Sequence, residues 1–92
     1  MALTVTDAPD QNRFEGRFDG ELAGYLEYRR ADGVWFLTHA FTLPHQRGRG
    51  VAAEVTRHAL DSAKAAGATV RPVCPFVADF IAAHQEYEAL TR

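Results

Sequence analysis

The chain has 92 residues, a length that suits one domain, residues 1–92, with a single compact core. Its net charge of −2 at pH 7 excludes a strong general attraction to nucleic acid or to an acidic membrane, so any basic function has to be local. Cys74 is the only cysteine, which excludes an internal disulfide, and without a basic leader or a long apolar run we expect a cytoplasmic protein.

Alternating apolar and polar residues predict strands in the first half of the chain. The predicted strands are residues 3–6, 13–18, 22–28 and 34–42. Asp19-Gly20 and Ala31-Asp32-Gly33 are typical of the tight turns of hairpins. Aromatic and β-branched residues crowd both faces of 34–42, so we expect this strand to be central and buried on both sides.

The second half of the chain begins with a helical pattern. Apolar residues at helical spacing predict a helix that ends at Gly67, namely Val51, Val55, Ala59, Ala63 and Ala66. Residues 68–74 predict a further strand, in which Pro72 removes a hydrogen-bond donor and argues against pairing on both edges. Pro75 suits the first position of a final helix over 76–84. The order of elements predicts an α+β fold with a mostly antiparallel mixed sheet and two main helices.

Residues 47–52, Arg-Gly-Arg-Gly-Val-Ala, have the composition of an anion-binding loop. Glycine permits left-handed backbone conformations, and the first turn of a helix has free N–H donors and the positive end of the helix dipole. A flexible connection with solvated arginines is the alternative, but two glycines are costly where a helix must nucleate. A nucleoside-triphosphate loop is less favoured, because the Gly-Lys-Ser/Thr ending is absent.

This strand, loop and helix resemble a known family. The loop, which follows Pro44, is similar to the R/Q-x-x-G-x-G/A signature of the GNAT N-acetyltransferase superfamily. His39 lies eight residues before the first loop arginine, and Cys74-Pro75-Phe76-Val77 opens the last helix. With these features, nearly all of the chain resembles the minimal single-domain branch of the superfamily.

The resemblance implies a function and a set of binding residues. It implies transfer of an acetyl group from acetyl-CoA to an amine. Loop amides, with charge from two arginines, would bind the pyrophosphate, and the residues concerned are Arg47, Gly48, Arg49, Gly50, Val51 and Ala52. The resemblance further implies that the pantetheine arm pairs with backbone near Ala40 and Thr42, in a gap beside the strand that carries Cys74.

Cys74 and His39 are the candidate catalytic residues. Cys74 lies at the start of the last helix, where the dipole and free N–H donors favour a thiolate, but a lone cysteine is also a common core residue. His39 shares a strand face with Trp35, Leu37 and Phe41, so it is either a core histidine or a base. The resemblance favours the catalytic interpretation of both. Two routes stay open: transfer through the thiol, or direct attack by the amine with His39 accepting a proton and Cys74 returning one.

Other features limit this interpretation. Many GNAT enzymes carry a tyrosine in the last helix, where this chain has Phe80, and Tyr87 falls beyond the helix. The N-terminal helices that commonly wall the acceptor pocket are absent, so the amine is unidentified, and a non-catalytic coenzyme A or acyl-CoA binding module is the alternative. We expect no metal, no nucleic acid, no membrane partner, and a monomer or weak homodimer. The glutamates Glu15, Glu21 and Glu27 are expected to be solvated.

Overall fold

The computed structural model describes residues 2–92, and in this part of the chain two Asp-Gly turns fold the first half into an antiparallel meander. Asp19 and Gly20 have φ of 49° and 83°, and Asp32 and Gly33 have φ of 53° and 77°. Paired positive φ values of this kind match the twist of the strands that the turns connect. Both turns confirm the sequence prediction.

The strands are β1 (Leu3–Ala8), β2 (Arg13–Phe18), β3 (Glu21–Ala31), β4 (Val34–Thr42) and β5 (Thr69–Pro72). They form one sheet of five strands in the order β1-β2-β3-β4-β5. Neighbours are antiparallel except β4 and β5, which are parallel and are connected through a helix. The predicted α+β class with a mixed, mostly antiparallel sheet is therefore confirmed.

Helical segments complete the chain. They are η1 (Pro9–Gln11), η2 (Pro44–Gln46), α1 (Val51–Ala66), α2 (Pro75–Ala83) and η3 (Gln85–Thr91), where η marks a 3₁₀ segment. α1 ends because Gly67 takes a φ of 68°, which lets the Ala68 N–H donate to the Ala63 carbonyl. η3 was not expected from the sequence. Within residues 2–92 no helix is both long and apolar enough to cross a membrane.

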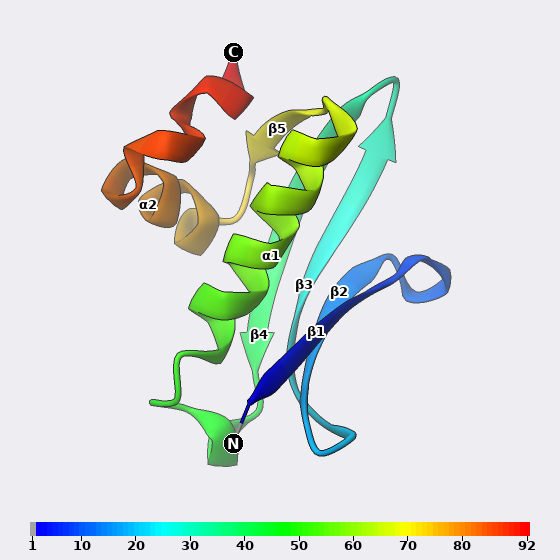
Figure 1. Ribbon diagram of the computed structural model, residues 1–92, viewed down its shortest axis with the longest axis vertical. Helices are drawn as coiled ribbons and strands as arrows, with labels where there is room; N and C mark the ends of the chain where they lie inside the picture. The colour runs from blue at the N-terminus through cyan, green and yellow to red at the C-terminus, as the bar shows by residue number, and fades with distance from the viewer. Residues whose placement is uncertain (1) are drawn as a thin grey trace.

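α1, α2 and η3 all lie on one face of the sheet (Figure 1). α2 and η3 lie beside α1, since Tyr87 of η3 donates a hydrogen bond of 2.7 Å to Asp61 of α1. None of these three segments covers the opposite face. The expectation that β4 is buried on both sides is therefore wrong, because Leu37 is its only fully buried residue.

β5 is shorter than the predicted strand 68–74. It ends at Pro72, and Val73 then makes a local turn in which its N–H donates to the Arg71 carbonyl at 3.0 Å. Cys74 lies at the N-cap of α2, with extended φ and ψ of −68° and 125°, rather than in a strand. The predicted strand is wrong at its end because a proline without an N–H donor is followed immediately by the helix start.

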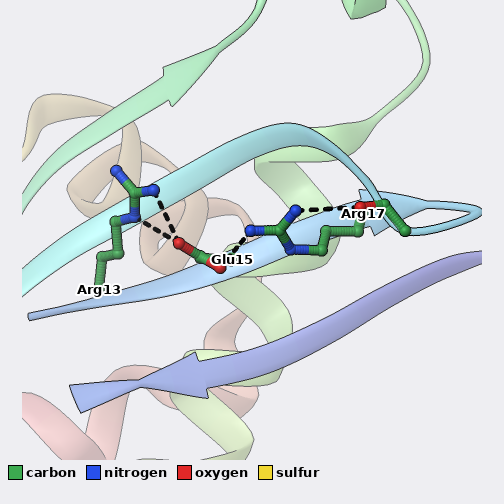
Figure 2. A network of polar contacts seen from close by, with 4 residues as sticks. Arg13, Glu15 and Arg17 are labelled. Carbon is green, nitrogen blue, oxygen red and sulfur yellow. Dashed lines mark hydrogen bonds and ion pairs between the residues drawn. The ribbon is translucent and has the colours of Figure 1, made fainter. Parts of the chain in front are cut away.

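Glu15 lies on the sheet face without helices, yet only 7% of it is exposed. One of its oxygens accepts a hydrogen bond of 2.7 Å from Arg13, and the other accepts one of 2.9 Å from Arg17 (Figure 2). Residues two apart in a strand share a face, so both arginines can close over the carboxylate between them. The expectation that Glu15 is solvated is therefore wrong, whereas Glu21 is exposed and Glu27 is half-buried.

We predict that Glu15 makes the stability of the fold sensitive to acid. The hydrogen bond from Arg17 is the main cause that holds the pKa of Glu15 below its ordinary 4.5; burial opposes it, and the hydrogen bond from Arg13 adds to it. Because the folded pKa is lowered, this stabilisation is present above pH 4.5 and is lost as the pH falls through the folded value. Urea unfolding between about pH 6 and pH 3 should show a steeper loss for wild type than for Glu15→Gln. The exposed Glu21→Gln is the control, and equal slopes for wild type and Glu15→Gln would contradict the prediction.

We predict that Thr56→Val stabilises the protein. Thr56 of α1 is completely buried, and its Oγ1 has no hydrogen-bond partner in the described part of the chain. A buried hydroxyl without a partner costs about 1 kcal/mol or more, and valine has nearly the same shape and a similar helix propensity. Urea unfolding should show a free energy of unfolding about 1 kcal/mol higher than that of wild type. A loss of stability would show that the hydroxyl has a favourable interaction.

Candidate active site

The second half of β4 has an open edge on the side of β5. The two strands pair only as far as Leu37 and Pro72, and the Cys74 N–H then donates to the Leu37 carbonyl at 2.9 Å. Beyond this bond the chain enters α2 and diverges from β4. Within the described residues 2–92, residues 38–42 therefore have no strand partner on this side.

Ala40 and Thr42 direct their backbone groups toward this open edge. The Leu43 N–H donates to the carbonyl of Ala23 in β3 at 2.9 Å, so the backbone of Leu43 faces β3. In antiparallel pairing, alternate residues direct their N–H and C=O groups to the same neighbouring strand. The backbone groups of Thr42 and Ala40 thus point away from β3, where an extended ligand could pair with them.

The loop between β4 and α1 presents a run of free N–H groups. Gly48 and Gly50 have φ of 81° and 74°, conformations that other residues rarely adopt, and they lead the chain into α1. The first N–H of this region with a helical partner is that of Glu54, which donates to the Gly50 carbonyl at 3.1 Å. For the N–H groups of residues 48–53 no acceptor is found within residues 2–92. These donors lie at the positive end of the α1 dipole and can bind an anion.

A hollow of about 270 Å³ opens beside these N–H groups; we call it the loop hollow. Its lining comes from the end of β4, the loop, the first turn of α1 and the start of α2, with the residues Thr42, Gln46, Arg47, Gly48, Gly50, Val51, Ala52, Ala53 and Phe76. Six of the eight residues expected to bind the cofactor are in this lining. The other two, Ala40 and Arg49, are not.

The side chain of Arg49 points away from the loop hollow. Its guanidinium donates to the Gln46 side chain at 2.8 Å and lies 4.1 Å over the ring of Phe18. Arg49 instead lines a larger hollow of about 440 Å³ beside β1. Among residues 2–92, Arg49 is the only loop residue in the lining of that hollow. Gln46 is nearly buried and fixes Arg49, so it supports the loop. Gln46 was not among the residues expected from the sequence, although its position three residues before Arg49 was an available signal.

Phe76 also lines the loop hollow, although it was not among the expected binding residues. It lies in the first turn of α2 and is 41% exposed, which is unusual for so large an apolar side chain. Val73, just before α2, is 60% exposed. An exposed large apolar side chain in the lining of a hollow, as with Phe76, is typical of a ligand-binding surface. The available signal was an aromatic residue in a helix start next to the candidate Cys74.

Cys74 and His39 both lie near the open edge of β4, Cys74 at the start of α2 and His39 in β4 itself. Cys74 is 5% exposed and packs in the core at the N-cap of α2. His39 is exposed in β4, opposite Glu27 of β3. No hydrogen bond joins the Cys74 thiol to His39 among the described residues. The thiol is therefore shielded, while the imidazole is accessible from the sheet face that lacks helices.

The sequence profile of the GCN5-related N-acetyltransferase family matches residues 13–90, a range that includes β4, the loop and both α-helices. The chain belongs to this family. It is accordingly an acyltransferase whose family transfers acetyl groups. A comparison with curated protein sequences finds no match.

A solved structure supports the fold of this N-acetyltransferase. The chain is similar to the solution NMR structure of a GCN5-like protein from Staphylococcus aureus, with a TM-score of 0.72 and 16% sequence identity. The alignment covers 96% of this chain and 86% of the other. At this identity the similarity shows the fold alone.

This N-acetyltransferase has no tyrosine in α2. Phe80 of α2 stacks on His84 at 4.0 Å between ring centres, and Tyr87 of η3 is buried with its hydroxyl bonded to Asp61. Burial and then the hydrogen bond to Asp61 raise the pKa of Tyr87, which makes it a poor proton donor. No group of three or more histidine, cysteine, aspartate or glutamate side chains in residues 2–92 could hold a metal ion.

Proposed function

We propose that the chain transfers an acetyl group from acetyl-CoA to an amine. The observation that carries the proposal is the run of free N–H groups at residues 48–53 beside the open edge of β4. Such donors bind a pyrophosphate, and an open strand edge binds an extended arm that contains amide groups. Acetyl-CoA has both parts, and it supplies an activated acetyl thioester when bound.

Different residues of the site would bind different parts of acetyl-CoA. The backbone of residues 47–52 would hold the pyrophosphate. Arg47, which lines the loop hollow, would add positive charge. Arg49 would contribute its N–H, while its side chain supports the loop through Gln46. The backbone of Ala40 and Thr42 would pair with the pantetheine arm. Phe76, across the hollow, would cover the apolar part of the arm.

His39 and Cys74 are the residues that we propose for the chemistry. His39 is exposed in the strand that borders the gap, so it can accept a proton from the attacking amine. In the first route the Cys74 Sγ bonds to the acetyl carbon, the thioester bond to coenzyme A breaks, the thiol proton passes to the departing thiolate, and the amine then takes the acetyl group from Sγ. In the second route the amine attacks the thioester directly and Cys74 returns a proton to the departing thiolate. Either role requires the thiol to become accessible from the gap, because it is now 5% exposed.

The buried thiol also favours a second candidate function. A module that binds coenzyme A or an acyl-CoA without efficient turnover needs the loop and the β4 edge but needs no reactive thiol. The shielding of Cys74 and the lack of a hydrogen bond to His39 in residues 2–92 fit this alternative. Consumption of the thioester across a panel of amines distinguishes the two functions.

The experiment that tests the proposed chemistry is mass spectrometry after incubation with acetyl-CoA. An acetyl group on Cys74 supports transfer through the thiol, and its absence with a large loss of turnover in Cys74→Ala supports the proton-donor role. Full turnover by Cys74→Ala removes this residue from both routes. Calorimetry with coenzyme A on the same variants shows whether binding is intact, and no thioester consumption with intact binding supports the binding module.

We also propose the wider setting of the activity. Residues 1–92 form one domain, which is supported by a hydrophobic core shared by the sheet and both α-helices. The protein acts in the cytoplasm as a monomer or weak homodimer, without a metal. The net charge of −2 supports the absence of nucleic-acid and membrane partners.

A further inference from the structure

The sheet face without helices carries a group of arginines and aromatic rings, which we call the arginine face. It contains Arg13, Arg17, Tyr25, Arg29, Phe36 and Phe41. The strand register places Tyr25 beside both Glu15 and Phe41, and Arg29 beside Phe36. Figure 2 shows Arg13 and Arg17 on this side of β2, with the helices behind the sheet.

Two of the three arginines of this face, Arg13 and Arg29, stack on aromatic rings. The Arg13 guanidinium lies 4.3 Å over the Tyr25 ring, and the Tyr25 ring lies 5.4 Å from that of Phe41. The Arg29 guanidinium lies 4.3 Å over the Phe36 ring. Stacked guanidiniums are pre-oriented, so they lose less freedom when they bind an anion.

The arginine face has a surplus of positive charge on a chain that is acidic overall. Three arginines share it with two carboxylates, those of Glu15 and Glu27. Both oxygens of Glu15 already accept hydrogen bonds, and Arg29 forms no ion pair within residues 2–92. Since the whole chain has a net charge of −2, the residues outside this face carry more negative than positive charge. A partner with a complementary charge would therefore be acidic.

The shape and position of the face suggest the kind of partner. The hollows of about 270 Å³ and 440 Å³ are lined by the loop and by the helix side of the sheet, and neither includes an arginine of this face. A face whose arginines line neither of these hollows suits a polypeptide better than a small molecule. The exposed His39 lies on the same face, since it pairs with Glu27, which pairs with Arg13. A chain bound to the arginine face would thus reach the open edge of β4.

We propose that the arginine face binds an acidic segment of the polypeptide that carries the acceptor amine. This inference rests on the proposed function, because it identifies the acceptor class of that site. A second copy of this chain is a poor occupant, since like charges would meet across a twofold axis. Nucleic acid is also a poor occupant, because the rings of Tyr25 and Phe36 already stack on arginines and the chain is acidic overall.

Peptide binding measured by fluorescence anisotropy tests this proposal without any need for turnover. The probes are two labelled 12-residue peptides with a free N-terminal serine, one with six aspartate and glutamate residues and one with asparagine and glutamine in their place. We expect the acidic peptide to bind the coenzyme A-loaded protein at least about tenfold more tightly, with an affinity that falls steeply with salt. Equal affinities for the two peptides would overturn the proposal.

Variants locate the binding surface. Arg29→Glu should weaken acidic-peptide binding about tenfold. The triple variant Arg13→Gln, Glu15→Gln and Arg17→Gln keeps polar groups in the network, removes its net charge, and should weaken binding about threefold to tenfold. Arg92→Glu is the matched control, since it makes the same charge change in an arginine that is 75% exposed and bonded to Glu88 of η3. Equal weakening by Arg92→Glu and Arg29→Glu would overturn the proposal.

Two further arms separate this inference from its alternatives. In the first arm, the acidic peptide is replaced by phosphatidylserine vesicles or by a single-stranded oligonucleotide. Binding of either one through Arg29, without binding of the acidic peptide, would overturn the inference. Calorimetry with coenzyme A reports on the proposed function separately. Absence of coenzyme A binding defeats the proposed function, whereas coenzyme A binding without preference for the acidic peptide defeats only the acceptor class.

Discussion

Replacing Gly50 by valine is expected to weaken coenzyme A binding about 100-fold. Gly50 has a φ of 74° at the N-cap of α1, where a β-branched residue is strained, so the backbone must rotate and turn its N–H groups away. Loss of one or two hydrogen bonds to a charged group costs about 3 kcal/mol, and each 1.4 kcal/mol is about tenfold in affinity. Isothermal titration calorimetry with coenzyme A measures the effect.

Gly33→Val is the matched control for this variant. Gly33 has a φ of 77° and open space around it, so valine introduces the same kind of strain. It lies in the turn between β3 and β4, at the end of the sheet away from the loop (Figure 1). Both variants should lose stability, and only Gly50→Val should lose affinity. Equal affinities of the two variants for coenzyme A would show that the loop does not hold the ligand.

Gly24→Ala is expected to lower the free energy of unfolding by about 2–3 kcal/mol. A Cβ at Gly24 would lie 2.6 Å from the Phe41 carbonyl oxygen and 2.9 Å from a methyl group of Val51. The carbonyl belongs to the neighbouring strand, and Val51 is the first residue of α1, so neither can move without shifting the sheet or the loop. Urea unfolding measures the loss, and a weaker affinity for coenzyme A should accompany it.

Gly16→Ala provides the comparison for this second variant. A Cβ at Gly16 would lie 2.8 Å from a methyl group of Val55 and 3.3 Å from the methyl groups of Leu3. These neighbours are side chains, which can change their conformation at lower cost than backbone. Gly16→Ala should therefore lose less stability than Gly24→Ala. The reverse order would contradict the close packing of α1 on β3.

Local sequence signals were sufficient for much of the fold. The Asp-Gly turns, Gly67 as the end of α1 and Pro75 as the start of α2 follow from backbone preferences that act within a few residues. The glycine loop likewise combines a local backbone requirement with the start of a helix. For this reason its conformation and position in the fold could be anticipated.

Tertiary arrangement was harder to predict from the sequence. The alternation around Glu15 indicates an exposed face, but it does not show that two arginines close over the carboxylate. The aromatic residues of β4 suggested a second covering layer, whereas Phe36 is instead covered by Arg29. Arg49 was expected to face the anion, but its side chain turns to Phe18. Each error concerns the conformation of an arginine side chain, which is set by the partner it finds in the folded chain rather than by the alternation of apolar and polar residues.

The most direct test of the central claim is an NMR titration of ¹⁵N-labelled protein with coenzyme A, with pantetheine, which lacks the phosphates, as the control ligand. We predict that the N–H resonances of residues 48–53 shift in a saturable manner with coenzyme A and stay in place with pantetheine. Saturable binding of coenzyme A that leaves these resonances unmoved would contradict the claim that the loop binds the pyrophosphate.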